Sequence, residues 1–375
     1  MYKRQKYDTT DYYQIDPSFG TTEDLKELVQ KAHERGMKVV LDAVYNHTGR
    51  EFFAFADILE NGEKSKYRDW YFIDGFPLKS EWGEIPNFKC FGYYGGMPKL
   101  NLKNPEVEKY ITDVACYWIK ECDIDGWRLD VGDEISHFFW KNFRKAVKAV
   151  KKDMLIIGEI WHYAGDFLEG DEWDTVMNYP FYLNLIDLLA DEKITVSQFV
   201  QNLGYLKGRL HKNCYPLMWN LIDSHDTARF LHLCNDNKKK QHLAAAFQLL
   251  LPGMPMIYYG DEYAMPGAND PDCRRGMYWD EEYQDKEMYE WYKRLIQVRK
   301  SHACIVEGEL AGSVTEDEEG TVVLIRKNGE ETIAMIFNCS SSAKKFNEYT
   351  QKYNLLTENT FDGNVEGFDA AVIVL

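Results

Sequence analysis

From residue 21 onward, apolar residues alternate between helical spacing and short continuous runs. The first helix is predicted from Thr22, as its cap, to a stop at Gly36, because the apolar positions between them share one face, at Leu25, Leu28, Val29 and Ala32. The segment KVVLDAV follows at 38–44, and its unbroken apolar character is typical of a strand covered on both faces.

The same alternation continues to residue 300. Short apolar runs predict strands at 124–131, 155–161, 176–182, 217–223 and 254–260. Helical spacing predicts helices at 104–119, 137–151, 241–251 and 286–300, and a further one that ends at Leu189. Strands that alternate with helices form parallel sheets, so the predicted fold class is α/β.

Two regions break the alternation. Residues 48–103, rich in glycine, proline and aromatic residues, form a long excursion after the first strand. From residue 303 the pattern changes to short strands separated by EDEEG, KNGEE and CSSSAKK. This change predicts an antiparallel β unit, a small sandwich, over 303–375.

The first five residues, MYKRQ, do not look like a natural start, because the helix-and-strand pattern begins in mid-stride right after them. They read like a translated frame of a transposon end used in sequencing libraries. We therefore interpret residues 1–5 as a sequencing artefact joined to part of a longer gene, which resequencing across that junction would test.

Composition argues against several classes of protein but does not identify the function. The chain is 45% hydrophobic and 15% aromatic, which suits a large core, and its net charge of −17 argues against a nucleic-acid partner. The sequence contains no apolar stretch long enough to span a bilayer and no secretory signal. Its eight cysteines are scattered without a CxxC pair, which favours free thiols in a cytoplasmic protein over disulfides or a zinc site.

Polar residues stand at the ends of four predicted strands. They are Asp42, Asn46 and His47 at the end of the first strand, then Arg128 and Asp130, then Glu159, and finally His225 and Asp226. Active sites in parallel α/β folds form outside the carboxyl ends of the strands. An ion pair or a helix cap is the simpler interpretation of any single group, but four groups at the same strand ends predict one pocket.

The same segments resemble a known family. DAVYNH (42–47), GWRLDVGDE (126–134), GEIW (158–161) and LIDSHD (221–226) resemble, in order, the four signature segments of the α-amylase superfamily, glycoside hydrolase family thirteen. Three further segments are similar to the cyclomaltodextrinase, neopullulanase and maltogenic amylase branch, namely MPKLN (97–101), VMNYPF (176–181) and GDEYAMPGANDPDCRRGMYWDEE (260–282).

The resemblance implies a TIM (β/α)8 barrel, and it begins after the first strand–helix units of that barrel. We expect an incomplete barrel over residues 6–302 that lacks the first two of eight strand–helix units and the amino-terminal accessory domain. Residues 48–103 would be an inserted domain in the third loop, and residues 303–375 a carboxy-terminal β domain. An incomplete barrel exposes two sheet edges, so we expect a weakly stable and poorly active chain.

The resemblance also implies the catalytic roles. Asp130 would be the nucleophile, Glu159 the general acid and then base, and Asp226 a transition-state stabiliser. A retaining glycosidase needs two carboxyl groups about 5 Å apart, one ionised and one protonated. We expect Arg128, on the same strand face as Asp130, to keep Asp130 ionised. The alternative for this pair is a structural salt bridge.

Other residues are implied to bind the sugar. His47 and His225 would hold hydroxyls at the cleavage point, Asp42 would orient them, and Tyr7 would stack under the same sugar unless it is an ordinary surface aromatic. Trp161 and Phe91 are candidates for stacking the leaving-group sugars, although both could belong to the core. Asp270 and Arg274 match a pair that contacts more distant glucose units, and a loop salt bridge is the rival interpretation.

The sequence supports no metal or cofactor. Many α-amylases carry Lys-His where this chain has Asp133 and Glu134, and the histidine helps to hold calcium, so Asn46 alone does not make that site credible. The predicted partner is an α-glucan oligosaccharide. Dimerisation, which relatives achieve through the accessory domain, is not expected of this chain.

We therefore expect a retaining hydrolase of the cyclomaltodextrinase and neopullulanase type, which cleaves α-1,4 bonds in cyclodextrins, pullulan or maltooligosaccharides. The rivals are an α-amylase or a transglycosylase with the same catalytic residues, and a non-catalytic barrel relative. The last rival is disfavoured because such relatives typically lose the acidic trio.

Overall fold

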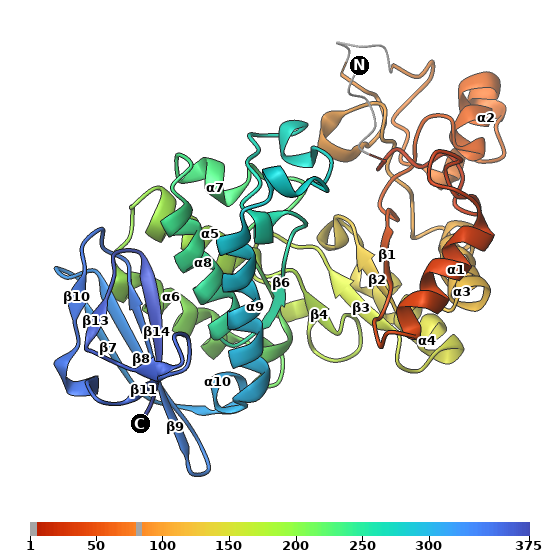
Figure 1. Cartoon of the computed structure of the whole chain (residues 1–375). Helices are drawn as coiled ribbons and strands as arrows, with labels where there is room; N and C mark the ends of the chain where they lie inside the picture. The colour runs from red at the N-terminus through yellow and green to blue at the C-terminus, as the bar shows by residue number, and fades with distance from the viewer. Residues whose placement is uncertain (1–5, 80–84) are drawn as a thin grey trace. The chain divides into compact units, whose positions relative to one another are not determined.

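The computed structural model describes residues 6–79 and 85–375, so the MYKRQ segment lies outside the described residues. The chain divides into two compact units. Unit 1 comprises residues up to Ile160 together with Ala164–Val176, and unit 2 comprises Trp161–Tyr163 with Met177–Leu375. They run from red to yellow-green and from green to blue, respectively, in Figure 1.

Unit 1 is built around a parallel sheet of four strands in the order β1-β2-β3-β4. The strands are β1 (Val40–Ala43), β2 (Gly126–Leu129), β3 (Leu155–Gly158) and β4 (Thr175–Val176). Its α-helices are α1 (Thr22–His33), α2 (Phe53–Asn61), α3 (Pro105–Cys122) and α4 (His137–Val150), as Figure 1 shows. The predicted parallel arrangement is confirmed for these strands.

Helix caps explain where the unit 1 helices begin. Thr21, one residue before the predicted cap, closes a capping box with Asp24, so the prediction of Thr22 as the cap is wrong by one position. Asn104 caps α3 as its side chain accepts from the Glu106 N–H, and Pro105 follows as the first helical residue. These caps fix the starts of two helices, α1 before β1 and α3 before β2.

The described residues of the 48–103 excursion contain α2 (Phe53–Asn61), three short 3-10 helices at Gly62–Lys64, Arg68–Trp70 and Phe91–Tyr93, and isolated bridges. The bridges pair Tyr71 with Leu100 and Cys90 with Pro98. Phe55 packs edge-on against Tyr71, with ring centroids 5.0 Å apart, and both are buried. The aromatic residues of the excursion continue into the rest of unit 1, since Phe53 and Trp70 pack on Tyr110 of α3.

Unit 2 begins with parallel strands and helices and ends with antiparallel strands (Figure 1). Strands β5 (Trp219–Leu221) and β6 (Met254–Met256) form a parallel pair, and Met177 makes a parallel bridge to Trp219. The α-helices are α5 (Tyr179–Leu185), α6 (Val196–Arg209), α7 (Phe230–Leu233), α8 (Lys238–Leu250), α9 (Lys286–Ser301) and α10 (Cys304–Glu307), and a π-helix follows α5 at Ile186–Ala190.

The predicted strand at 176–182 is wrong for most of its length. Residue Val176 ends β4, and Tyr179 begins α5. Asn178 caps this helix by accepting from the Phe181 N–H, and Pro180 stands in its first turn, where a missing N–H costs nothing. The apolar run at 176–182 therefore contains the start of a helix and not a full strand.

The carboxy-terminal strands form a six-stranded antiparallel sheet in the order β12-β11-β14-β9-β8-β7, beside a two-stranded sheet of β10 and β13. Their bounds are β7 (Glu309–Glu316), β8 (Thr321–Asn328), β9 (Glu331–Asn338), β10 (Lys344–Lys345), β11 (Tyr353–Asn354), β12 (Asn359–Thr360), β13 (Asn364–Val365) and β14 (Asp369–Val374). One core lies between the two sheets and includes Ile336 and Val365, whereas Phe337 faces the helices and stacks on Phe247 of α8 at 4.2 Å.

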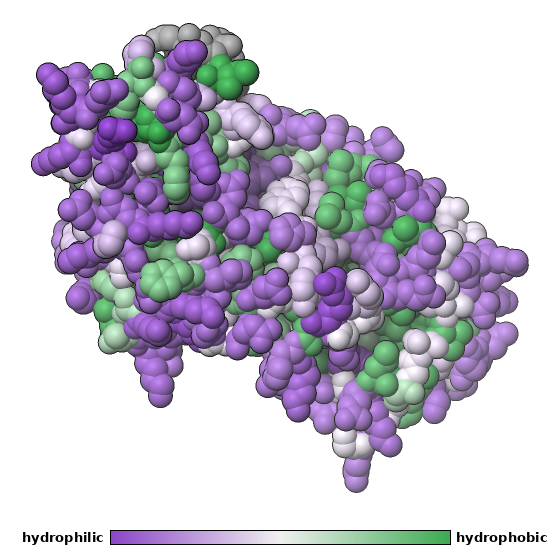
Figure 2. All heavy atoms as spheres, turned by 180° about the vertical axis from the view of Figure 1, so that it is seen from behind, coloured by the Kyte–Doolittle hydropathy of each residue, from purple (hydrophilic) through white to green (hydrophobic). Residues whose placement is uncertain are grey.

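The surface carries the charge that the composition predicts. Hydrophilic residues cover most of the face shown in Figure 2, with smaller apolar groups between them. All eight cysteines are free thiols. Within residues 6–79 and 85–375, no helix combines the length and the apolar character needed to cross a membrane.

Candidate active site

The guanidinium group of Arg128 joins three carboxylates in unit 1. Arg128 lies opposite Asp42 in the β1–β2 ladder, and its Nη1 donates to Asp42 Oδ1 at 2.9 Å and to Asp130 Oδ1 at 2.8 Å. Its Nη2 forms an ion pair with Glu159 Oε2 at 2.8 Å. Arg128, Asp130 and Glu159 are at most 10% exposed, so one buried cation holds two buried carboxylates beside each other.

The backbone at Val131 also binds Glu159, which sequence analysis did not foresee. The predicted strand ends at Leu129, and Val131 adopts a left-handed conformation with φ 47° and ψ 43°. This conformation is strained for a β-branched residue. It directs the Val131 N–H at Glu159 Oε2, 3.0 Å away, so the strain serves to hold the carboxylate.

Burial raises the pKa of Asp130 from its ordinary value of 3.8 to about 8. Arg128 lowers this pKa, while the neighbouring charges of Glu159 and Asp42 raise it. The expectation that Arg128 keeps Asp130 ionised is therefore wrong in this structure. The physical reason is that one guanidinium is shared among three carboxylates, so its charge does not offset the loss of hydration at Asp130.

This shift predicts a pH-dependent stability. Because the folded pKa of Asp130 is raised, the folded chain binds more protons than the unfolded chain between about pH 4 and pH 8, and stability is lost as the pH rises through that window. Asp130→Asn cannot ionise, so its unfolding free energy relative to the unmodified chain should increase from pH 4 to pH 8, by several kcal/mol. Urea unfolding at several pH values measures this difference.

Asp125 offers a control of opposite sign. Burial opposes its ionisation, but hydrogen bonds from the Val39 N–H and from His33, Lys151 and Lys38 outweigh burial and hold its pKa well below the ordinary range. Asp125→Asn should therefore be most destabilising near neutral pH and less so in acid. A pH-independent difference for Asp130→Asn would contradict the raised pKa.

Tyr7 and His47 complete this group. The Tyr7 hydroxyl donates to Asp42 Oδ2 at 2.7 Å, and burial raises its pKa, so it stays protonated. Burial lowers the pKa of His47 to about 4, which leaves the ring neutral at pH 7. His47 Nε2 lies 3.0 Å from the Tyr7 carbonyl oxygen and, because it must donate there, fixes Tyr7 in place; the Phe91 ring stacks on His47 at 5.2 Å.

Lys99 binds both Asn46 and Glu134, the residues at which the sequence does not support a calcium site. Lys99 Nζ donates to Glu134 Oε2 at 2.7 Å and also to Asn46 Oδ1, while Asn46 Nδ2 donates to the same Glu134 oxygen at 3.2 Å. Sequence analysis missed Lys99, although it lies in the quoted MPKLN segment. Across the described ranges, no cluster of three or more His, Cys, Asp or Glu side chains is arranged to hold a metal ion.

Asp226 lies in unit 2 with its own cation. His225 Nε2 is 3.1 Å from Asp226 Oδ2, and Arg274 Nη2 donates to Asp226 Oδ1 at 3.1 Å. Arg274 Nε donates to the His225 carbonyl at 2.8 Å and pairs with Asp270 Oδ1 at 2.9 Å. Asp270 and Arg274 thus form the ion pair considered as the rival interpretation, and that pair is bound directly to Asp226.

Trp161 stacks on a tyrosine that sequence analysis quoted but did not single out. The Trp161 and Tyr179 rings are 3.9 Å apart and nearly parallel, and Trp161 remains 40% exposed, so it is not a core residue. The Tyr179 hydroxyl donates to Ser224 Oγ at 3.3 Å, and Ser224 Oγ accepts from the Asp226 N–H at 3.2 Å. A chain of contacts therefore joins Trp161 to Asp226 within unit 2.

Comparison with known proteins shows which family the chain belongs to. The family described as "Alpha amylase, catalytic domain" matches residues 2–287. The chain belongs to the α-amylase catalytic-domain family. Its fold is accordingly of TIM-barrel type, followed by an antiparallel sheet at the carboxy-terminal side.

Its relatives within the family are similar over most of this chain. A cyclomaltodextrinase from Geobacillus thermopakistaniensis (strain MAS1) is 48% identical over 90% of this chain and 57% of its own length. Neopullulanase 2 from Thermoactinomyces vulgaris is 43% identical over 89% of this chain and 57% of its own length. A solved structure named cyclomaltodextrinase superposes with a TM-score of 0.93 at 39% identity and covers 98% of this chain and 65% of that chain. This α-amylase-family chain thus spans about three fifths of the length of such relatives.

Proposed function

We propose that the chain carries the catalytic residues of a retaining glycoside hydrolase that cleaves α-1,4-glucosidic bonds in cyclodextrins, pullulan or maltooligosaccharides. One observation carries the proposal: the single guanidinium of Arg128 binds both Asp130 and Glu159, and both carboxylates are buried. Two carboxyl groups held this way suit a reaction in which one attacks the anomeric carbon and the other protonates the leaving oxygen. The names of the relatives, cyclomaltodextrinase and neopullulanase 2, support this substrate class.

The reaction proceeds in two displacements. Asp130 uses an oxygen lone pair to form a bond to the anomeric carbon while Glu159 gives its proton to the departing glucosidic oxygen, which breaks the old bond. Glu159 then takes a proton from water, and the water oxygen displaces Asp130 from the sugar. The configuration at the anomeric carbon is inverted twice and is therefore retained.

The proton must be on Glu159 and not on Asp130 when the bond breaks. The raised pKa of Asp130 means that substrate binding has to favour the ionised form of this side chain. The positive charge that develops on the sugar ring favours ionisation of Asp130. This charge lies beside the Asp130 side chain and stabilises the carboxylate but not the protonated acid. Arg128 and the Val131 N–H, which both contact Glu159, hold that side chain in place during the transfer.

The remaining residues fall into two sugar-binding groups. In unit 1, Tyr7 would stack on the sugar at the cleavage point, while His47 and Asp42 hold Tyr7 in place. In unit 2, Asp226 and His225 would bind hydroxyls and Trp161 would stack a leaving-group sugar. Arg274 would orient Asp226 through one charged hydrogen bond.

Product analysis tests the proposed function. The chain is incubated with α-cyclodextrin, pullulan and soluble starch, and the products are separated by chromatography. We expect ring opening of cyclodextrin and release of short maltooligosaccharides, with the α-anomer formed first in NMR spectra. Longer products than the substrate would identify a transglycosylase, and a strong preference for starch an α-amylase. No reaction by a folded chain on any of the three would contradict the proposal.

For the fold, we propose a barrel of six strand–helix units over residues 6–302, with 48–103 inserted and 303–375 as a separate β domain. Among the described strands, β1 pairs only with β2, and β6 only with β5. Met254 and Ile257, in and just beyond β6, are 44% and 36% exposed, as expected of sheet edges that further strands would cover. Comparing this chain with one extended upstream, in stability and in activity, tests this arrangement.

A further inference from the structure

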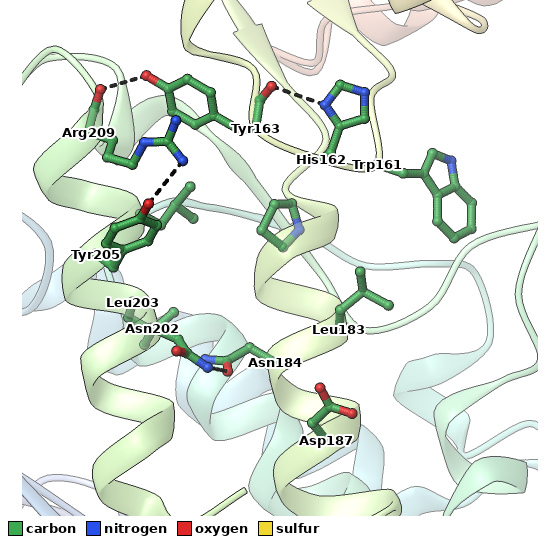
Figure 3. A pocket seen from close by; sticks show the side chains of 12 residues that line it. Trp161, His162, Tyr163, Leu183, Asn184, Asp187, Asn202, Leu203, Tyr205 and Arg209 are labelled. Atoms are coloured by element: carbon green, nitrogen blue, oxygen red, sulfur yellow. Dashed lines mark hydrogen bonds between the residues drawn. The ribbon is translucent and has the colours of Figure 1, made fainter. Parts of the chain in front are cut away.

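A pocket lies wholly within unit 2, between α5, α6 and the segment Trp161–Tyr163. Its cavity volume is about 370 Å³, within the range of small-molecule sites. Figure 3 shows Asn184 of α5 pointing to Asn202 of α6, and Leu183 on the side of α5 toward Trp161; all four residues line the pocket. No residue assigned above to the cleaved bond lines this pocket, and only Trp161 at its rim belongs to the sugar-binding groups.

One wall of the pocket consists of two tyrosine rings fixed by an arginine. The Arg209 guanidinium lies 3.9 Å from the centre of the Tyr163 ring and 5.3 Å from that of Tyr205. Arg209 Nη1 donates to the Tyr205 hydroxyl at 3.3 Å, and the Tyr163 hydroxyl donates to the Arg209 carbonyl at 2.7 Å (Figure 3). The rings are thus ordered in advance, and Tyr205 is 67% exposed, so its ring is accessible to a ligand.

The helices add polar groups at fixed positions. Asn184 Nδ2 donates to the Phe199 carbonyl at 3.0 Å, and its Oδ1 accepts from Asn202 Nδ2 at 2.8 Å. Asn202 Oδ1 accepts no hydrogen bond from the part of the chain that the structure describes. Leu183, 43% exposed, also lines the pocket and adds an apolar side chain to it.

The charges indicate a neutral ligand. Arg209 and Asp187 are the only lysine, arginine, aspartate or glutamate residues among the lining side chains, and their charges balance. A phosphate or carboxylate ligand would need an excess of positive charge. Flat ring faces, an oriented amide and balanced charge match a pyranose, which offers an apolar ring face and a rim of hydroxyl groups.

We propose that this pocket binds pyranose units of an α-glucan chain, as a site separate from the residues that contact the cleaved bond. The inference rests on the proposed function for the identity of the sugar. It gives Tyr205, Asn202 and Leu183 a role in holding long substrates that neither the chemistry nor the signature segments require.

Titration calorimetry with maltoheptaose tests the site in the Glu159→Gln background, where the sugar is not cleaved. Tyr205→Ala should weaken binding roughly threefold to tenfold, the effect of losing one aromatic contact. Tyr205→Phe, which keeps the ring, should bind nearly as the parent does, and so should Tyr353→Ala, an exposed tyrosine elsewhere in unit 2. Leu183→Ala should reproduce part of the loss.

Equal affinities for Tyr205→Ala, Tyr205→Phe and Tyr353→Ala would overturn the pocket assignment. Hydrolysis by the unmodified chain is measured in parallel. If hydrolysis occurs but Tyr205 does not affect binding, the pocket inference alone fails. If the folded chain hydrolyses nothing and maltoheptaose binding still depends on Tyr205, the proposed function fails and the pocket assignment stands.

Discussion

Replacing Glu159 by glutamine should lower the hydrolysis of cyclodextrin by about a thousandfold, the usual contribution of a positioned general acid. Glutamine has the shape of glutamate and can still accept the Val131 N–H, which lies 3.0 Å from Glu159 Oε2, so the site should keep its structure. It cannot donate an acidic proton to the leaving oxygen. Steady-state rates with cyclodextrin measure the loss.

The leaving group separates this effect from a general loss of structure. An α-glucosyl fluoride needs no proton to depart, so the formation of the glycosyl-enzyme from it should fall much less in Glu159→Gln than cyclodextrin hydrolysis does. Glu134→Gln is the matched control, because Glu134 follows the neighbouring strand β2 but binds Lys99 and Asn46 instead of Arg128. Equal losses in the two variants would refute the role of Glu159.

Arg128→Met should be the most destabilising single change in unit 1, by about 3–5 kcal/mol at pH 8. It removes the cation that contacts Asp42, Asp130 and Glu159 and leaves two carboxylates that are less than 10% exposed without their counter-charge. The loss should be smaller at pH 5, because Asp130, whose pKa is raised, is then protonated and needs no counter-charge. Urea unfolding at the two pH values measures both effects.

Arg294→Met is the control for losing an arginine–carboxylate pair. Arg294 binds Glu358 at 2.6 Å, but the partners are 26% and 55% exposed, so the loss should be under about 1 kcal/mol. If Arg128→Met costs no more than Arg294→Met, or costs the same at both pH values, the two buried carboxylates of Asp130 and Glu159 do not depend on Arg128.

The parallel strands and the grouping of polar residues at their ends could be predicted from the sequence. Periodicity identified β1, β2 and β3 because short apolar runs between capped helices have few other interpretations. The contacts of Arg128 with Asp42 and Asp130 follow from strand alternation and register, since Asp42 is the ladder partner of Arg128. Sequence alone places such residues on one face of a sheet.

Other features depended on tertiary context. The run at 176–182 has the composition of a strand, but Asn178 and Pro180 start a helix there. Tyr179 and Phe181 are buried on that helix, and apolar composition alone does not distinguish a buried helix from a buried strand. Val131 was placed in a strand because nothing in its side chain signals a left-handed backbone. The raised pKa of Asp130 depends on burial and on a cation shared by three groups, and neither can be read from spacing.

The central claim is that Asp130 and Glu159 flank one bond and act by double displacement. Trapping with 5-fluoro-α-glucosyl fluoride tests it most directly, because the first displacement then outpaces the second and the glycosyl-enzyme accumulates. After proteolysis, mass spectrometry should find the added sugar on the peptide that contains Asp130, and the label should be absent from Asp130→Asn. A label on another residue, or hydrolysis without any label on Asp130, would contradict the account.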